Sequence, residues 1–139
     1  MGFDGIFAIT TNGIVKRERT CVMGRGCARQ TAARFPELPS KLASRISAQG
    51  NHVSYFPEYR FITFPVKHNW WEAADLNLIG RSARELLKIV EVKKIKKAIY
   101  LLRPGCGNGR LKWKEVKKSL SPILKSDQFH IVTYSRINS

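Results

Sequence analysis

The sequence predicts an α/β protein in which a sheet lies between two layers of helices, a three-layer α/β/α arrangement. Short runs rich in apolar and β-branched residues, typical of strands, alternate with stretches whose apolar residues recur every three or four positions, typical of amphipathic helices. Polar or glycine-bearing loops follow several strand-like runs, as expected at the carboxyl edge of such a sheet. The 139 residues and 43% hydrophobic content suit one domain, spanning residues 1–139, with its own core.

The first third of the chain contains one predicted strand and two predicted helices. The run Gly5–Ile9 is almost wholly apolar, which is typical of a strand buried on both faces, and residues 10–13 end it in a turn. A helix is expected to begin near Gly26 and to stop at the prolines that follow it. Ser40 is expected to cap a second helix, which Gly50 ends.

The middle of the chain contains two predicted strands and the most regular helical pattern. The runs Val53–Phe56 and Phe61–Phe64 are rich in β-branched and aromatic residues, as strands are. Asp75 then precedes apolar residues at steps of three and four, which predict a long amphipathic helix. These apolar residues are Leu76, Ile79, Ala83, Leu86, Leu87 and Val90.

The last third is expected to form a strand, a helix and a closing strand. The run Ala98–Arg103 is strand-like and leads into a glycine-rich loop. A helix is expected to open at Arg110–Trp113, and Pro122 is expected to kink it or end it early. Residues Phe129–Tyr134 form the closing strand of the prediction.

The net charge is the strongest signal of the whole molecule. Lysine and arginine number 25 against 10 aspartate and glutamate, which gives +15 at pH 7. Such an excess attracts polyanions at long range and in a salt-dependent way, so it predicts a polyanionic partner, and we expect nucleic acid to be that partner through the basic surface. The alternative is that the charge only keeps the protein soluble.

The cysteines and the hydropathy pattern indicate the cellular compartment in which the protein is expected. Cys21, Cys27 and Cys106 show no C-x-x-C pairing, which argues against a disulfide framework and against a zinc knuckle. The sequence has no apolar run of membrane-spanning length and no signal-peptide pattern. We therefore expect a soluble cytoplasmic protein with no metal, no cofactor and no membrane attachment, and the oligomeric state stays open.

The loop Pro104–Gly109 is expected to hold a phosphate group. Its glycines allow positive φ and let backbone N–H groups approach a ligand that a Cβ would keep away. The N-terminus of the helix that follows adds partial positive charge. A tight strand-to-helix turn without any ligand is equally compatible with this loop alone.

A second glycine-bearing loop, Gly24–Ala28, precedes the first predicted helix. Glycines at a helix N-terminus again offer N–H groups to an anion, and Arg25 adds a fork of donors. The alternative is that Gly24 and Gly26 only allow close packing. Two such loops in one small domain favour a shared polyphosphate ligand over two independent turns.

With these segments in order, the chain resembles the macro domain family, whose members bind ADP-ribose. The resemblance runs from about Gly5 to Tyr134 and is strongest for the branch of DNA ADP-ribosyl glycohydrolase antitoxins and terminal ADP-ribose hydrolases. The order and spacing of the matching segments are more specific to the family than any one segment alone. The segments that carry it are Thr10–Gly13, Val22–Ala28, Phe64–Trp70 and Arg103–Trp113.

The resemblance implies a ligand site and a reaction. By resemblance, the two glycine loops hold the diphosphate and the distal ribose, and Tyr134 lies beside the adenine. Lys67 matches the lysine that attacks the ribose anomeric carbon in the resembling hydrolases, and Asn12 is the second predicted catalytic residue. The predicted ligand-binding residues are Thr11, Asn12, Gly24, Arg25, Gly26, Cys27, Ala28, Gly105, Cys106, Gly107, Asn108, Gly109 and Tyr134.

Two features depart from the family's pattern. Nothing before Gly5 matches the family's first strand or the aspartate that holds the adenine, so we expect the sheet to lack that strand; Asp4 is the acidic residue nearest to the position. Gly109 stands where some of the hydrolases carry an aspartate. A mechanism built on a lysine and aspartate pair therefore does not carry over whole.

Attack by Lys67 requires its amine to be neutral. A free lysine titrates near about 10.4, so we expect the site to lower the pKa through burial beneath Trp70 or Trp71 and through neighbouring cations. The alternative is that Lys67 only pairs with a ligand phosphate.

The leading hypothesis is a hydrolase that removes ADP-ribose from a macromolecule, with nucleic acid favoured as the carrier. A non-catalytic ADP-ribose reader and a phosphatase acting on ADP-ribose 1″-phosphate are the alternatives. A plain nucleic-acid-binding protein would leave the paired glycine loops unexplained. A cysteine hydrolase would pair Cys106 with His68 or His130, although no residue spacing links them.

Overall fold

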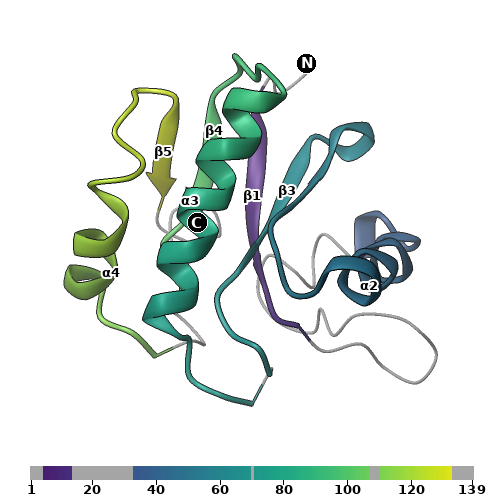
Figure 1. The fold of residues 1–139 in the computed structure, drawn as a ribbon, viewed down its shortest axis with the longest axis horizontal. Coiled ribbons are helices and arrows are strands. Elements are labelled where there is room, and N and C mark those ends of the chain that lie inside the picture. Colours follow the sequence, from purple (N-terminus) through teal and green to yellow (C-terminus); the bar gives the residue numbers. More distant parts are fainter. Residues whose placement is uncertain (1–4, 14–32, 70, 107–109, 133–139) are drawn as a thin grey trace.

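The computed structural model describes residues 5–13, 33–69, 71–106 and 110–132. Within them lies a five-stranded sheet of order β2-β3-β1-β4-β5, of which only β2 is antiparallel to its neighbour (Figure 1). The carboxyl ends of β1, β3, β4 and β5 therefore share one edge of the sheet, which we call the carboxyl edge. The strands are β1 (Ile6–Thr11), β2 (Ser54–Phe56), β3 (Phe61–Pro65), β4 (Ile99–Leu102) and β5 (Phe129–Val132).

The central strand β1 is the point at which the chain changes direction across the sheet. From β1 the chain passes to β2 and β3 on one side, and from β3 it crosses to β4 and β5 on the other. In open α/β sheets, ligands bind outside the carboxyl ends of the strands at such a switch point. The topology thus places the ends of β1, β3 and β4 where a ligand is expected.

Helices cover both faces of the sheet, which confirms the predicted three-layer arrangement. Alternate residues of a strand point to opposite faces. Ala8 and Ile62 belong to the apolar cluster beneath α3 (Leu76–Val92) and α4 (Trp113–Leu120), whereas their neighbours Ile9 and Phe61 belong to the cluster beneath α2 (Leu38–Gln49). β1 is the first strand in the part of the chain that the structure describes.

Helix α3 confirms the clearest sequence pattern and is fastened to the end of β3. The Asp75 carboxylate caps the helix by accepting from the backbone N–H groups of Asn77 at 2.9 Å and Leu78 at 3.4 Å. The Asp75 N–H donates to the carbonyl of Val66 at 2.7 Å. The Ser82 hydroxyl donates to the carbonyl of Pro65 at 2.7 Å. These bonds fix the segment that follows β3 against the start of α3.

The start of α2 differs from the prediction. The helix begins at Leu38 with Glu37 as its N-cap residue and no side-chain cap, so the prediction that Ser40 caps it is wrong. Pro39 lies in the first turn, where a helix does not use the N–H that proline lacks, so this proline opens the helix instead of delaying it. Gly50, with φ +87°, ends the helix as expected.

Other boundaries differ from the prediction by a few residues: β1 continues through Thr11, where a turn was predicted, and α4 begins at Trp113, the last residue of its predicted opening. Helix α4 ends at Leu120, ahead of Pro122. Ala33 and Arg34 are helical, while the rest of the helix expected from Gly26 lies outside the described residues. Among the helices that the structure describes, none is long and apolar enough to cross a membrane.

Candidate functional site

The segments that follow β1 and β3 run side by side beyond the sheet. The Val66 N–H donates to the carbonyl of Thr11 at 3.0 Å, and the Gly13 N–H donates to the carbonyl of His68 at 3.0 Å. Thr11 and Asn12 are buried, at 6% and 9% exposure. The structure therefore brings Thr11, Asn12 and Lys67, three of the predicted site residues, to one place on the carboxyl edge.

Lys67 lies in a loop that is closed by its own hydrogen bonds. Its side chain is half-buried, and its Nζ donates to the carbonyl oxygen of Glu72 at 3.2 Å. The Glu72 carboxylate accepts from the backbone N and side-chain Nδ2 of Asn69, at 3.0 and 2.7 Å. Trp71 is 57% exposed, so most of its surface faces solvent. The amine of Lys67 is thus held by the backbone of the loop between β3 and α3.

The loop after β4 meets the same edge and is pressed against α3. Gly105 has φ +78°, and a Cβ built on it would lie 2.9 Å from Ala74 Cβ and from Ile79 Cδ1. Its carbonyl accepts from the N–H of Leu111 at 2.8 Å. The positive φ expected of this glycine is confirmed, and close packing on α3 is a second reason why no side chain fits there.

Two arginines that the sequence analysis did not single out border this loop. Arg110 Nη2 donates to the carbonyl of Trp71 at 3.4 Å and so joins the loop after β4 to the loop after β3. The guanidinium of Arg103 lies 4.9 Å from the centre of the Trp113 ring, at the start of α4. Both residues flank the glycine loop in the sequence, but the contact between Arg110 and Trp71 is made only by the fold.

Cys106 is suited to a structural role. Its Sγ donates to the carbonyl of Pro104 at 3.7 Å, and burial raises the pKa of the thiol, an effect that Arg103 only partly offsets. The two histidines of the cysteine-hydrolase hypothesis are engaged elsewhere. His68 Nδ1 lies 3.5 Å from Asn51 Nδ2, and the His130 ring stacks on Tyr100 with centroids 4.9 Å apart.

Alkylation should show that Cys106 is unreactive at neutral pH. Because its pKa is raised, the thiolate fraction at pH 7 is smaller than that of a free cysteine and grows only as the pH rises towards that raised value. We expect iodoacetamide to react more slowly with Cys106 than with the thiol of free glutathione. Peptide mass spectrometry follows the labelling of Cys106. Labelling of Cys106 faster than glutathione at pH 7 would contradict this account.

Several predicted site residues lie outside the part of the chain that the structure describes. They are Gly24, Arg25, Gly26, Cys27, Ala28, Gly107, Asn108, Gly109 and Tyr134, together with Trp70 of the loop after β3. Among the residues that are described, no group of three or more histidine, cysteine, aspartate or glutamate side chains is placed to hold a metal ion.

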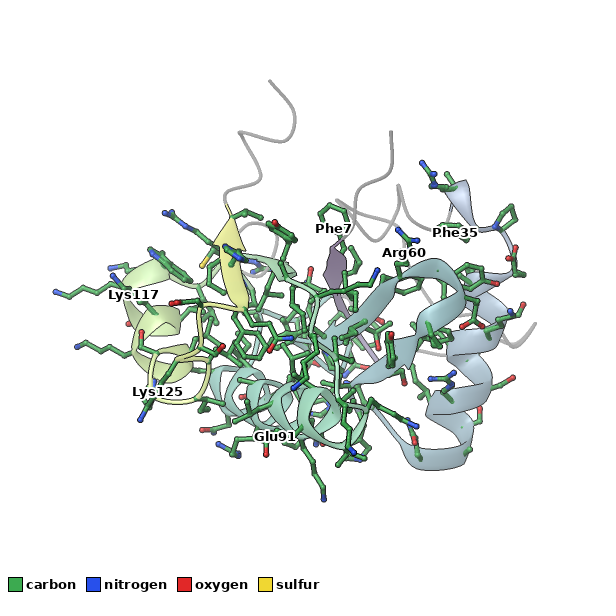
Figure 2. The ribbon with its side chains drawn as sticks, turned by 90° about the horizontal axis from the view of Figure 1, so that it is seen from above. Phe7, Phe35, Arg60, Glu91, Lys117 and Lys125 are labelled. Carbon is green, nitrogen blue, oxygen red and sulfur yellow. The ribbon has the colours of Figure 1, made fainter. Side chains whose placement is uncertain are left out.

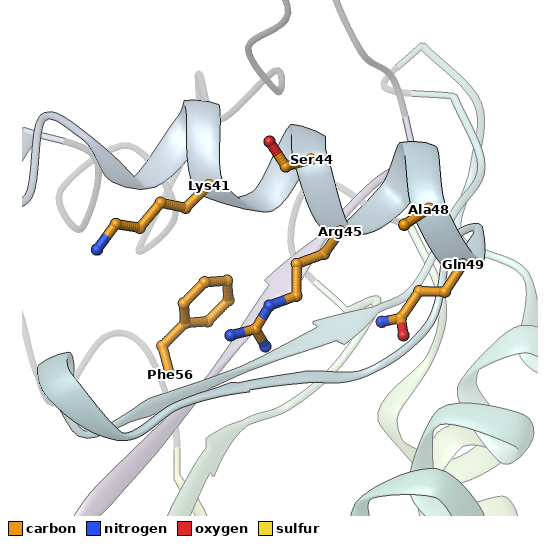
Figure 3. Close-up of a pocket in the computed structure, with 6 residues that line it drawn as sticks. All are labelled: Lys41, Ser44, Arg45, Ala48, Gln49 and Phe56. Carbon is orange, nitrogen blue, oxygen red and sulfur yellow. The ribbon is translucent and has the colours of Figure 1, made fainter.

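A surface cavity of about 360 Å³ lies away from the carboxyl-edge residues, between α2 and β2 (Figure 3). The two cationic side chains that line it, Arg45 and Lys41, already make contacts within the protein. The Arg45 guanidinium lies 4.1 Å from the centre of the Phe56 ring and donates to the carbonyl of Tyr55 at 2.8 Å. Lys41 donates to the Tyr59 hydroxyl at 2.7 Å. None of the predicted site residues lines this cavity, so we do not assign the ligand to it.

Comparison with known proteins shows which solved structures share this fold. No protein-family model matches the chain, and a comparison with curated proteins finds no match. Among solved structures, the chain is similar to the macrodomain of Mycobacterium tuberculosis DarG, with TM-score 0.75 and 22% identity over 94% of this chain and 88% of that one. It is also similar to the macrodomain of Thermus aquaticus DarG, with TM-score 0.72 and 21% identity over 94% and 89%.

A third similar structure contains a ligand. It is Thermosipho africanus DarTG in complex with ADP-ribose, with TM-score 0.72 and 18% identity over 92% of this chain. The chain spans 37% of the length of that protein. TM-scores of 0.72 to 0.75 over nearly the whole chain establish a shared architecture. The chain therefore has the macrodomain fold.

Proposed function

We propose that the chain binds ADP-ribose at the carboxyl edge and hydrolyses the bond that joins ADP-ribose to a macromolecule. The observation that carries this proposal is the meeting of three predicted site segments at one edge, on a fold shared with a protein solved with ADP-ribose. Asn12 and Lys67 come together through the bond between Gly13 N–H and the His68 carbonyl, and Arg110 ties the Gly105 loop to the same place.

In the proposed reaction, Lys67 acts as the nucleophile. Its neutral amine forms a bond to the anomeric carbon of the distal ribose as the bond from that carbon to the carrier breaks, and the departing atom of the carrier takes up a proton. Water then attacks the same carbon, releases ADP-ribose and restores the amine. Asn12, buried beside the Lys67 loop, orients the ribose.

Release of ADP-ribose from defined carriers tests the proposal. An ADP-ribosylated DNA oligonucleotide and an ADP-ribosylated protein are incubated with the chain, and free ADP-ribose is measured by mass spectrometry. We expect release from DNA to be the faster. Binding of ADP-ribose without release from either carrier would favour the non-catalytic reader, and release of inorganic phosphate from ADP-ribose 1″-phosphate would favour the phosphatase.

Helix α4 carries the basic surface that we propose receives the nucleic acid. Exposed lysines of α4 and of the segments on either side of it, with Lys117 and Lys125 labelled in Figure 2, project from one side of the molecule. The ion pairs among the described residues involve Lys41, His52 and Arg81, so none of them neutralises an α4 lysine. The chain reaches α4 from the Gly105 loop, where the Leu111 N–H donates to the Gly105 carbonyl at 2.8 Å, so the start of the helix lies near the carboxyl edge. The surface comprises Lys112, Lys114, Lys117, Lys118 and Lys125.

Charge reversal on α4 should weaken binding to DNA and reduce its dependence on salt. Each phosphate contact contributes about 0.9 to the slope of log K against log salt, so Lys114→Glu, Lys117→Glu and Lys118→Glu together should lower the slope by about 2–3. Affinity for free ADP-ribose should change much less. Binding is measured by fluorescence anisotropy between low and physiological salt.

A matched variant carries the same charge change at the opposite edge of the sheet. It combines Lys88→Glu, Lys93→Glu and Lys96→Glu, three exposed residues on α3 and after it. We expect its salt slope to stay close to that of the wild type. Equal loss in the two triple variants would show that the net charge, and not the α4 surface, governs DNA binding. If the affinities of the wild type for DNA and for ADP-ribose depended equally on salt, the proposal that the basic surface binds the carrier would be wrong.

A further inference from the structure

Asn51 contacts the loop that carries Lys67. It lies between Gly50, which ends α2, and the start of β2, and its side chain is half-buried. Its Nδ2 donates to the carbonyl of Lys67 at 3.2 Å and lies 3.5 Å from Nδ1 of His68. One amide group thus faces the backbone of Lys67 and the ring of the next residue.

The same side chain packs on the segment that carries Asn12. A Cβ built on Gly13 would lie 2.9 Å from both Cγ and Nδ2 of Asn51, so the amide lies directly against the Gly13 backbone. The Gly13 N–H donates to the carbonyl of His68 at 3.0 Å. Asn51 therefore touches both segments whose separation sets the distance between Asn12 and Lys67.

Side chains of helix α3 form hydrogen bonds with the backbone around Asn51. Arg81 Nη2 donates to the Asn51 carbonyl. The Glu85 carboxylate accepts from the N–H of Val53 at 2.9 Å and lies 2.6 Å from Nδ1 of His52. Arg81 Nε lies 3.5 Å from the same carboxylate. Residues 51–53 are thus bonded to side chains of the long helix α3, and these bonds fix the backbone that carries the Asn51 side chain.

We propose that Asn51 is a positioning residue of the proposed hydrolysis, one that fixes the Lys67 loop against the Asn12–Gly13 segment. This inference rests on the proposed function. The amide is required because it must donate to a carbonyl oxygen while it points its second N–H at His68 Nδ1. Aspartate has nearly the same shape, but its ionised carboxylate has no N–H to donate and would face the Lys67 carbonyl with two acceptors.

The test compares Asn51→Asp and Asn51→Ala with Asn77→Asp. Asn77 is exposed in the first turn of α3, so the control adds the same negative charge close to the carboxyl edge without touching Lys67 or Gly13. A displaced nucleophile lowers the rate of the bound complex, so we expect kcat for ADP-ribose release to fall by about 10²-fold in both Asn51 variants. KM and ADP-ribose affinity should change by less than about 3-fold, because the binding contacts stay. Asn77→Asp should keep the wild-type kcat.

Hydrogen exchange provides a readout that does not depend on catalysis. In Asn51→Asp, the amides of Gly13 and Val66 should exchange faster than in the wild type, while amides within α3 keep their rates. If the wild type releases no ADP-ribose but these amides respond, the proposed hydrolysis fails and the contact between the two segments stands. Unchanged kcat in both Asn51 variants would overturn the inference. Unchanged exchange at Gly13 and Val66 would overturn it as well. Asn51→Asp keeps the volume of the side chain, so it still tests the inference if Asn51→Ala does not fold.

Discussion

Lys67→Ala is expected to abolish release of ADP-ribose from its carrier while ADP-ribose binding is retained. If Lys67 forms the bond to the anomeric carbon, its removal leaves only slow attack by water, and the rate should fall by about 10³-fold or more. The phosphates and the adenine are held by other segments in the proposed site, so calorimetry should give a Kd close to that of the wild type. Release is followed by mass spectrometry under single-turnover conditions.

Two further variants separate the nucleophile from a simple cation. Lys67→Arg keeps a positive charge on a long side chain but cannot supply a neutral amine at neutral pH, so it should be as inactive as Lys67→Ala. Borohydride should trap a covalent adduct in the wild type alone, because the adduct between the Lys67 amine and the anomeric carbon can open its ribose ring to an imine, which borohydride reduces to a stable amine. If Lys67 only paired with a ligand phosphate, Lys67→Arg would stay active and Lys67→Ala would bind ADP-ribose weakly. A near wild-type rate in Lys67→Ala would move catalysis to Asn12, His68 or bound water.

Gly105→Ala is expected to cause the largest loss of stability of any single substitution proposed here. A non-glycine residue at φ +78° is strained, and the new Cβ would lie 2.9 Å from Ala74 Cβ and Ile79 Cδ1 and 3.1 Å from Leu111 Cδ1. Strain and overpacking together should lower the free energy of unfolding by roughly 2–5 kcal/mol. Urea unfolding followed by circular dichroism measures the change.

Gly80→Ala is the matched control and should change stability in the opposite direction. Gly80 lies inside α3, and the nearest neighbour of a Cβ built there is Arg84 Nη1 at 3.6 Å, an ordinary contact. Replacing a glycine in a helix interior with alanine should raise the free energy of unfolding by roughly 0.5–1 kcal/mol. A Gly105→Ala protein that unfolds at the wild-type urea concentration would show that the loop after β4 is not packed against α3 as described.

The local signals for α3 were confirmed, whereas the local signal for a cap at Ser40 was wrong. The apolar stripe behind Asp75 specifies α3, because capping and helical spacing are both read within one segment. The meeting of Thr11, Lys67 and Gly105 at one edge follows from parallel strands, whose carboxyl ends must lie together. The predictions at Gly24–Ala28, Gly107–Gly109 and Tyr134 fall outside the described residues and stay predictions.

Features that depend on distant contacts were missed. Val53 was predicted to begin β2, but its N–H donates to the Glu85 carboxylate of α3 and the strand begins at Ser54. Asn51 follows a helix-ending glycine in what reads as an ordinary turn, and its partners lie far along the chain at Gly13 and Lys67. No pattern within a single segment reports such contacts, since the tertiary fold alone creates them.

Calorimetric titration of the wild-type chain with ADP-ribose tests the central claim, that the carboxyl edge is an ADP-ribose site, most directly. The account predicts saturable binding of one ADP-ribose per chain, with a melting temperature that rises with ligand concentration because the ligand binds only the folded state. No heat of binding and an unchanged melting temperature up to millimolar ADP-ribose, about the weakest affinity worth assigning to a specific site, would contradict it.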